Sequence, residues 1–314
     1  MSDAYIPHKA CSLAFGLQTA QGIVGDADTN LPIIEDTTGP NWLKHYTFFQ
    51  YADGVYSKRH YFQEGEWLEG TIKVPVIPSM LTGDFYDWIL GRTSEATYYQ
   101  GYYGTLFRDL GHIREVYQDV KVKNGSLSIS RTGMAVLDLS IEGLTAPYET
   151  GTFAGDIYEA KPYIYSDATL QMAMGDGSYG TPASTLAAEN YTSNHTLEFD
   201  NMQESPADMI TLNGEIGPLA LPNSALPEWK GSFDRIFANA DLYRDFLAGR
   251  ECQYVLTMTH GTGAVATATM PRILIAEHPT SVQGSGILRG SGINFQALGS
   301  TDGSTLACEI SESV

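Results

Sequence analysis

Residues 67–92 read W-L-E-G-T-I-K-V-P-V-I-P-S-M-L-T-G-D-F-Y-D-W-I-L-G-R, and residues 229–250 read W-K-G-S-F-D-R-I-F-A-N-A-D-L-Y-R-D-F-L-A-G-R. Each stretch runs from a Trp and a Gly through a short apolar strand into a helix that ends in Gly-Arg. A repeat spaced by about half the chain predicts a duplicated domain. We therefore expect one domain over residues 1–150 and a second over residues 151–314.

The helix in each copy is expected to pack on a sheet. Leu81, Phe85, Trp88 and Ile89 lie at helical spacing and predict a helix that begins near residue 79. Gly91 would cap its C-terminus. Leu242 and Phe246 are the corresponding core residues of the second copy. An apolar stripe of this kind is typical of helix–sheet packing and not of a ligand pocket.

The closing strands of the two copies also match. Residues 137–143 align with residues 293–299, and apolar and polar residues alternate along both. This period predicts half-buried antiparallel strands, and Asn124-Gly125 predicts a turn before the first of them. Residues 196–201 and 206–213 are expected to be strands as well. The candidates for the polar face are Asp119, Asp138, Ser140, Glu142, Asn294 and Gln296.

Residues 44–66 are expected to form a long aromatic hairpin, because two aromatic runs flank a central Asp-Gly. Such a ribbon would be an exposed edge in a monomer, so we expect another copy or another ring to cover it. The candidate contact residues are Tyr46, Phe48, Phe49, Tyr51, Tyr56, Tyr61 and Phe62. Residues 25–42 precede the hairpin and are predicted to be an extended arm that packs against a neighbour.

The composition favours strands and turns. The chain has 314 residues, of which 43% are hydrophobic and 18% charged, with 32 Gly and 19 Tyr. The formal net charge of −19 argues against a nucleic-acid-binding surface, which needs clustered Lys and Arg. An acidic wall would let a polyanion pass without sticking. A solvated acidic surface that aids solubility, or suits a salty habitat, is the other interpretation.

Three cysteines without a C-x-x-C pair leave at least one thiol free and favour folding in a reducing compartment. The N-terminus lacks the pattern of a signal peptide, and no apolar run is long enough to span a bilayer. The sequence therefore predicts a soluble protein made in a cytoplasm.

No motif indicates catalysis, a metal or a cofactor. Residues 175–180 fit G-x-G-x-x-G, but neither a helix nor a βαβ pattern follows. Asp26, Asp28 and Asn30 have the opening spacing of a calcium loop, yet Leu31 and Thr37 stand where that loop needs Gly and Glu. The seven His residues show no zinc spacing. Carboxylates far apart in sequence could still meet, as in glycosidases, so this enzyme class stays open.

The order of elements resembles that of the tail tube proteins of long-tailed phages, in the form where two tube domains are fused. It comprises a strand, a long loop, an aromatic hairpin, a Gly-Thr or Gly-Ser strand, a short helix ending in Gly-Arg, and closing strands such as G-S-L-S-I-S-R-T-G-M-A-V-L-D-L-S-I-E-G-L at residues 125–144. The resemblance covers nearly the whole chain. It implies a mainly β fold in which each domain is a β-sandwich or split barrel flanked by one α-helix.

The resemblance further implies a structural virion protein, the major tail tube subunit. Three chains would form a pseudo-sixfold ring, and stacked rings would form a tube with an acidic lumen that delivers viral DNA into the host. The implied partners are other copies of the chain, the tape measure protein, and tail terminator or baseplate proteins. Viral DNA would pass without specific binding. The protein would be made in the host cytoplasm and reside in the virion tail.

A second function class remains open beside this one. A β-sandwich module that binds a receptor or carbohydrate would use the Tyr clusters on a small number of loops. Aromatic residues in long ribbons favour assembly instead.

Overall fold

A computed structural model gives the fold of the chain. It describes residues 12–32, 34, 40–49, 60–90, 101–110, 113–150, 161–211, 217–237, 239–282, 288–299 and 307–313. The fold is mainly β, as the sequence predicts.

Strands dominate both halves of the chain. The first half contains β1 (Ser12–Leu17), β2 (Thr29–Leu31), β3 (Asn41–Phe49), β4 (His60–Pro75), α1 (Gly83–Leu90), β5 (Gly104–Asp109), β6 (Arg114–Ile129), β7 (Ala135–Gly143) and β8 (Tyr148–Glu149). The second half contains the 3₁₀ turn η2 (Tyr165–Asp167), β9 (Ala168–Ala173), β10 (Ala187–Ala188), β11 (Thr192–Asp200), the 3₁₀ turn η3 (Pro206–Met209), β12 (Glu228–Ile236), α2 (Asp241–Ala248), β13 (Glu251–Thr259), β14 (Val265–Glu277), β15 (Ser281–Val282), β16 (Leu288–Ala297) and β17 (Glu309–Ser313).

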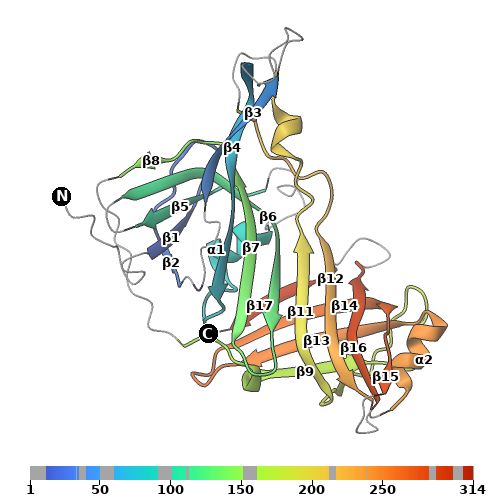
Figure 1. The fold of residues 1–314 in the computed structure, drawn as a ribbon. Helices are drawn as coiled ribbons and strands as arrows, with labels where there is room; N and C mark the ends of the chain where they lie inside the picture. Colours follow the sequence, from blue (N-terminus) through green and yellow to red (C-terminus); the bar gives the residue numbers. More distant parts are fainter. Residues whose placement is uncertain are drawn as a thin grey trace.

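One antiparallel sheet runs through the middle of the molecule and contains strands from both halves. Its order is β3–β4–β7–β6–β11–β12–β16–β14, and every neighbouring pair is joined by a backbone ladder. Figure 1 shows β7, β6 and β11 side by side at its centre, with β1, β2 and β5 to one side and β13 and β9 below. The two halves therefore share a sheet and do not meet only through side chains.

The same order of strand pairings occurs in each half. The first half has the ladders β1–β2, β1–β5, β5–β6, β6–β7, β6–β8, β4–β7 and β3–β4. The second half has β9–β10, β9–β13, β13–β14, β14–β16, β14–β17, β12–β16 and β11–β12. The helices α1 and α2 follow β4 and β12, which occupy the same place in the two sets.

The register of these ladders differs from the alignment expected from sequence. Gly70 pairs with Ile141, and Gly231 pairs with Phe295. If the two glycines correspond, then Phe295 matches Ile141, whereas the expected alignment matched it with Leu139. The shift is two residues, so it keeps every side chain on its predicted face.

The tryptophans that open the repeated stretches lie on different faces of their strands. Leu68 and Trp229 lie in the hydrophobic core, each two residues before its glycine. Trp67 precedes Leu68 and therefore points to the opposite face, where it stacks on His45 with ring centroids 3.7 Å apart.

The predicted hairpin is confirmed at its base. Antiparallel pairs join β3 to β4 from Asn41–Glu69 up to Phe49–His60. The ladder shifts register between His45 and Tyr46, which indicates a bulge. The hairpin projects away from the rest of the molecule in Figure 1. Its tip lies outside the described residues.

Helix α1 packs into the core of the first half. Phe85 and Trp88 contact Phe15 of β1 at 5.4 and 4.7 Å between ring centroids, and the indole N–H of Trp88 donates to the Val120 carbonyl at 2.8 Å. Leu81 and Ile89 are buried in the same core. In α2, Leu242 is buried and Phe246 packs partly against the core. Gly249 ends α2 in the left-handed conformation, with φ of 62°. Gly91 lies outside the described residues.

Three local predictions are wrong. The first helix begins at Gly83 and not near residue 79, because Ser79 and Gly83 adopt positive φ and form a turn. Asn124 and Gly125 lie inside β6, where ladders to β7 and β11 satisfy their backbone from both sides. Residues 206–209 form η3 instead of a strand, because Pro206 fixes φ for the first position of a turn.

The predicted arm belongs in part to the chain's own sheet. Thr29, Asn30 and Leu31 form β2 and pair with β1. Most of residues 33–39 lie outside the described part of the chain.

Among the described residues, neither helix has the length and apolar character needed to cross a membrane.

We expect Gly231→Ala to destabilise the protein by about 1–3 kcal/mol, because the new Cβ would lie 2.1 Å from the Phe295 ring. Gly261→Ala is the matched control, since among the described residues, its chain neighbours aside, no atom lies within 4 Å of the place that its new Cβ would take. Urea unfolding of both variants measures the difference. Equal stabilities would contradict the close strand packing at Gly231.

Candidate functional site

The polar face of the central sheet carries a row of open side chains. A depression of about 350 Å³ lies where β7, β6, β11 and β12 run side by side. Asp138, Ser126, Glu198 and Lys230 line it and lie at successive positions across these four strands. Two further depressions, of about 590 and 490 Å³, adjoin it toward β3 and β14. The polar residues therefore form a continuous surface across both halves, which we call the polar face.

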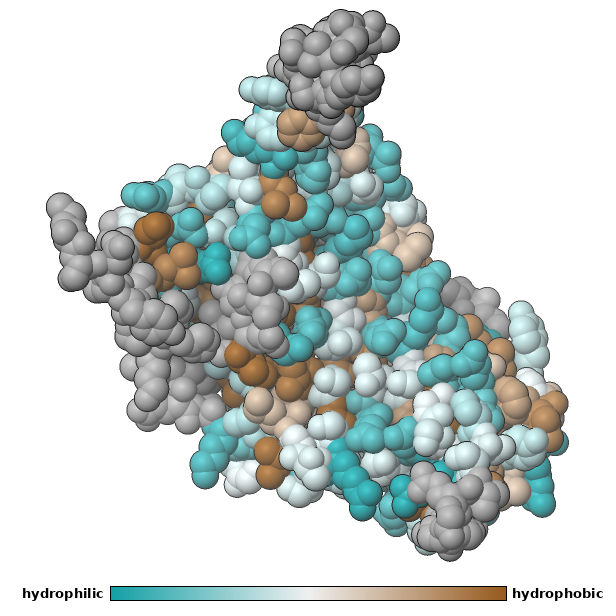
Figure 2. Space-filling view, in the orientation of Figure 1, coloured by the Kyte–Doolittle hydropathy of each residue, from teal (hydrophilic) through white to brown (hydrophobic). Residues whose placement is uncertain are grey.

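Carboxylates outnumber cations on the exposed part of this face. Lys73 lies 3.3 Å from Asp138, and Lys230 lies 3.9 Å from Glu228. Glu198 and Asp200 on β11 add two more exposed carboxylates. The surface is therefore hydrated and acidic in the middle of the sheet. In Figure 2, the region over β11 and β12 is mainly hydrophilic or neutral.

Four of the six predicted polar-face residues lie on this surface. Asp138 and Ser140 line the central depression from β7. Asn294 and Gln296 line the depression next to β14. The Asn294 amide donates to Glu277 at 2.7 Å, and the Gln296 amide donates to the Trp229 carbonyl at 2.8 Å.

Asp119 and Glu142 are placed differently, because both are buried. Asp119 has φ of 57° within β6 and accepts hydrogen bonds from the Gly22 amide at 2.6 Å and the Thr145 hydroxyl at 2.6 Å. Its carboxylate therefore fixes two loops. Glu142 lies at the edge of the polar face but beneath the connection between β11 and β12.

The described parts of that connection, residues 201–211 and 217–227, are held to the first half by a buried polar network. Glu142 accepts from Lys123 at 2.7 Å and from Gln203 at 2.7 Å. Lys121 donates to the Leu221 carbonyl at 2.5 Å and lies 4.8 Å from the centre of the Tyr103 ring. Burial lowers the pKa of Lys121 to about 7 and raises the pKa of Glu142, which Lys123 partly offsets.

The part of the polar face on β11 and β12 was not predicted from the sequence. Glu198, Asp200, Glu228 and Lys230 alternate with the buried residues Leu197, Phe199, Trp229 and Gly231. The same period-two pattern that identified residues 137–143 is present there. The sequence alone did not show which face of the sheet these residues occupy, because the pairing of β6 with β11 was not predicted.

The hairpin exposes an aromatic cluster. Tyr46, Phe48 and Tyr61 contact one another with ring centroids 5.5–6.3 Å apart, and Tyr61 keeps 66% of its surface exposed. Phe62 is also exposed and pairs with Thr47 on the opposite face of the hairpin. The side chain of Phe49, together with Tyr51 and Tyr56, lies outside the described residues. A contiguous exposed apolar cluster of this kind is typical of an interaction surface.

The joint between the two halves combines a ladder with side-chain contacts. Residues 195–200 of β11 pair with residues 124–129 of β6. The Asn201 amide donates to the Ile89 carbonyl at 2.7 Å and to the Val122 carbonyl at 2.9 Å. Ile89 is 3% exposed. The end of α1 is therefore closed by the second half.

The C-terminal strand β17 secures the same joint from the other side. The Glu312 carboxylate accepts from the backbone amides of Ser79 and Leu81, both at 2.9 Å, and from the Tyr163 hydroxyl at 2.7 Å. The Tyr86 hydroxyl accepts from the Ile310 amide at 3.2 Å. Burial and the Glu312 carboxylate raise the pKa of Tyr163, so its hydroxyl stays protonated and donates.

We expect Glu312→Ala to lower the free energy of unfolding by about 1–3 kcal/mol, because two amides in the turn before α1 lose their acceptor. Glu309→Ala on the same strand, whose side chain is exposed, should change it by less than about 0.5 kcal/mol. Thermal unfolding followed by circular dichroism measures both. A Glu312 variant as stable as the Glu309 variant would contradict a role for this contact.

Within the described ranges, no group of three His, Cys, Asp or Glu side chains is placed to hold a metal ion.

Comparison with known proteins identifies the family. Residues 63–297 match the family model described as phage tail tube protein. A comparison with curated protein sequences finds no match. The family match favours assembly over the alternative of a receptor- or carbohydrate-binding module, and the family is structural and not enzymatic. Because the match covers most of the chain, the protein belongs to the phage tail tube protein family: it is a structural component of the virion tail that assembles with its own copies into a tube.

Proposed function

We propose that three copies of this chain form a pseudo-sixfold ring, and that stacked rings form the tube through which viral DNA is delivered. The observation that carries this proposal is the joint between the halves, in which β11 extends the sheet of the first half through β6. A second joint of the same kind, between chains, would continue the sheet around a closed ring.

The repeated order of ladders supports two tube domains, residues 1–150 and residues 151–314. Duplication would explain why β3, β4, β6 and β7 have counterparts in β11, β12, β14 and β16. Each chain would then supply two near-equivalent positions, and three chains would supply six. One α-helix flanks the sheet in each domain.

Two strands at the ends of the described sheet are candidates for the second joint. In the ladders of the described residues, β3 pairs with β4 alone and β15 with β16 alone. The counterpart of β3 is β11, which pairs with β6 on its other side. By this correspondence, β3 of one chain would pair with the end of β14 and with β15 of the next. Backbone pairing at an exposed edge is a common mode of protein association.

The helix ends support the same interface. If Asp87 corresponds to Asp245, then Leu247 occupies the position of Ile89. Ile89 is 3% exposed at the joint, where Asn201 of the second half donates to its carbonyl, whereas Leu247 is 66% exposed. A neighbouring chain that covered α2 as the second half covers α1 would bury Leu247.

The polar face would line the lumen. Its exposed carboxylates, including Asp138, Glu198 and Glu228, would repel the phosphate backbone, and its few cations lie near acidic partners. Ser140, Asn294 and Gln296 would add polar, uncharged surface. DNA would then slide without specific binding. Asp119 and the buried Glu142 would support loops instead of facing DNA.

The resemblance to tail tube proteins suggests the remaining partners. A tape measure protein would occupy the lumen before DNA enters, and tail terminator and baseplate proteins would contact the two ends of the tube. Synthesis in the host cytoplasm is consistent with the free, buried Cys252 and Cys308.

Leu247→Asp is expected to leave the monomer as stable as the wild type and to weaken ring formation at least tenfold, because the interface would have to bury a charge. Ile113→Asp is the control, since Ile113 is an exposed apolar residue of the turn before β6. Analytical ultracentrifugation measures assembly, and thermal unfolding measures stability. Unchanged assembly of the Leu247 variant would contradict the proposed contact.

Charge reversal tests the lumen. We expect tubes of the Asp138→Lys, Glu198→Lys variant to retain a short fluorescent DNA duplex that is present during polymerisation, and to release it as salt rises. Wild-type tubes should release the duplex at every salt concentration. Glu149→Lys, Glu309→Lys reverses the same charge on strands outside the polar face. Equal retention by the two variants, measured after pelleting, would argue against a lumen lined by the polar face.

A further inference from the structure

We infer that the loop at residues 174–181, which presents Tyr179, receives the aromatic hairpin of a second copy of this chain within the same ring. The inference rests on the proposed trimeric ring. The hairpin would contact a neighbouring chain of its own ring at this loop.

The template for this contact is present inside the chain. The described parts of the connection between β11 and β12, residues 201–211 and 217–227, contact the first half. Its Leu219 carbonyl accepts from the Gln21 side chain at 3.1 Å, and its Leu221 amide donates to the Tyr103 hydroxyl at 3.1 Å. Gln21 lies in the loop between β1 and β2. This loop, Tyr103 before β5 and Lys121 in the middle of β6 thus form the surface that holds the connection, which we call the first seat.

Among the described residues, no segment covers the corresponding seat in the second half as the connection covers the first. Both ladders shift register at one place, after Val122 between β6 and β7 and after Ile275 between β14 and β16. Lys121, directly before Val122, pairs with Glu142, and Leu274, directly before Ile275, pairs with Gln296. By this count, Lys121 corresponds to Leu274 and Glu142 corresponds to Gln296. Lys121 and Glu142 are 3% and 5% exposed beneath the connection, whereas Leu274 and Gln296 are only half-buried.

The hairpin is the counterpart of the connection that fills the first seat. The connection joins β11 to β12, and the hairpin in the same way joins β3 to β4. The hairpin carries Tyr46, Phe48 and Tyr61, which pack on one another but remain exposed. The hairpin therefore presents exposed aromatic residues, and the second half presents the half-buried surface at which, by correspondence with the first half, a hairpin would bind.

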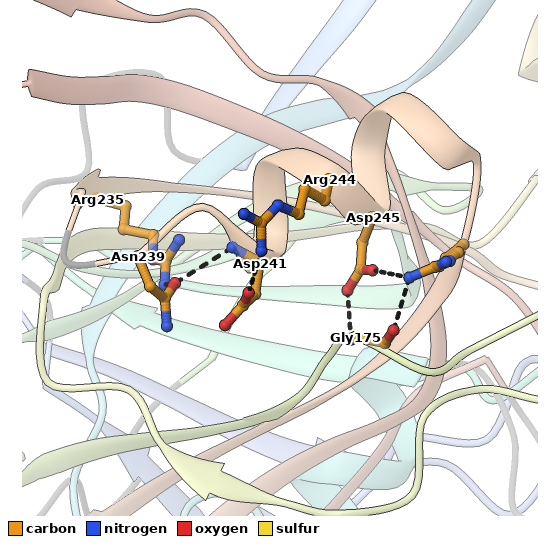
Figure 3. A network of polar contacts seen from close by, with 7 residues as sticks. Gly175, Arg235, Asn239, Asp241, Arg244 and Asp245 are labelled. Carbon is orange, nitrogen blue, oxygen red and sulfur yellow. Dashed lines mark hydrogen bonds and ion pairs between the residues drawn. The ribbon is translucent and has the colours of Figure 1, made fainter.

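The Tyr179 loop is held firmly enough to act as part of that seat. The Gly175 amide donates to Asp245 at 2.7 Å (Figure 3). The Arg250 guanidinium donates to the Gly175 carbonyl at 2.6 Å. At the other end of the loop, the Gly180 amide donates to Glu251 at 3.1 Å, and Arg272 holds Glu251 with two hydrogen bonds of 2.8 Å.

The loop between β1 and β2 is anchored by the same chemistry, since the Gly22 amide donates to Asp119. Although its backbone is held by these hydrogen bonds, the loop at residues 174–181 leaves Tyr179 88% exposed. A rigid loop that presents an exposed tyrosine has the character of an interface anchor, because little conformational entropy is lost on binding.

Cross-linking tests the contact. In a Cys11→Ser background, the pair Tyr61→Cys and Tyr179→Cys is treated with a short bismaleimide after assembly. A ring of three joins each hairpin to the next chain, so the products should run up to a trimer and stop there. Either single variant should give monomer only. Cys252 and Cys308 are buried and should not react.

The matched pair Tyr61→Cys and Tyr191→Cys tests the competing contact between rings. Tyr191 is 52% exposed and precedes β11 at the end of that strand farther from the hairpin. Products longer than a trimer from this pair, with none from the Tyr179 pair, would overturn the inference, because the hairpin would then reach another ring. Tubes in which the Tyr179 pair does not cross-link would overturn it and leave the trimeric ring intact. A wild-type protein that forms neither rings nor tubes would overturn the proposed function as well.

Tyr179→Ala supplies a readout that does not depend on cysteines. It should weaken ring assembly by about tenfold and leave monomer unfolding unchanged, because the side chain touches solvent in the isolated chain. Tyr191→Ala should change neither. Assembly of the Tyr179 variant at wild-type concentrations would overturn the inference.

Discussion

The backbone ladder between β6 and β11 is the constraint on which the rest of the structure depends. It joins residues 124–129 to residues 195–200 and thereby makes one sheet from two halves of the chain. Gly125 lies in this ladder because a Cβ there would fall 2.7 Å from the Phe199 ring and 2.8 Å from the Asp138 carbonyl oxygen. The side chains that surround the ladder, Asn201 and Glu312 among them, satisfy backbone groups at the two ends of the α1 region.

This arrangement separates the two surfaces that a tube subunit needs. One face of the sheet is packed on aromatic and aliphatic residues, and the other is acidic and hydrated from β4 to β14. Because the carboxylates alternate with buried residues on the same strands, the acidic surface is obtained without interrupting the core. The buried charges, such as Lys121 and Glu142, occur where the second half overlies the first.

Much of the fold could be predicted from local pattern. Alternation located β7, β11 and β16, aromatic runs flanking Asp-Gly located the hairpin, and an apolar stripe located α1. The predictions failed where long-range pairing overrides local preference. Asn124-Gly125 is a strong turn signal, yet its neighbours on both sides hold it in a strand. Trp67 and Trp229 look equivalent in sequence but face opposite sides of the sheet, since the spacing to Gly70 and Gly231 differs by one residue.

The polar face shows the same limit. Asp138 and Ser140 could be identified from alternation, whereas Glu198 and Glu228 needed the pairing of β6 with β11 to be known. Asp119 fits the alternation, but its positive φ at a bulge turns it into a loop anchor. The most direct test of the proposed ring is a count of chains per ring in the assembled tube by electron cryomicroscopy. We predict three chains per ring, which contribute six similar domains with strict threefold symmetry. The sheet should be continuous across each chain boundary. Six chains per ring, or a sheet interrupted at the boundary, would contradict the proposal that one chain supplies two positions.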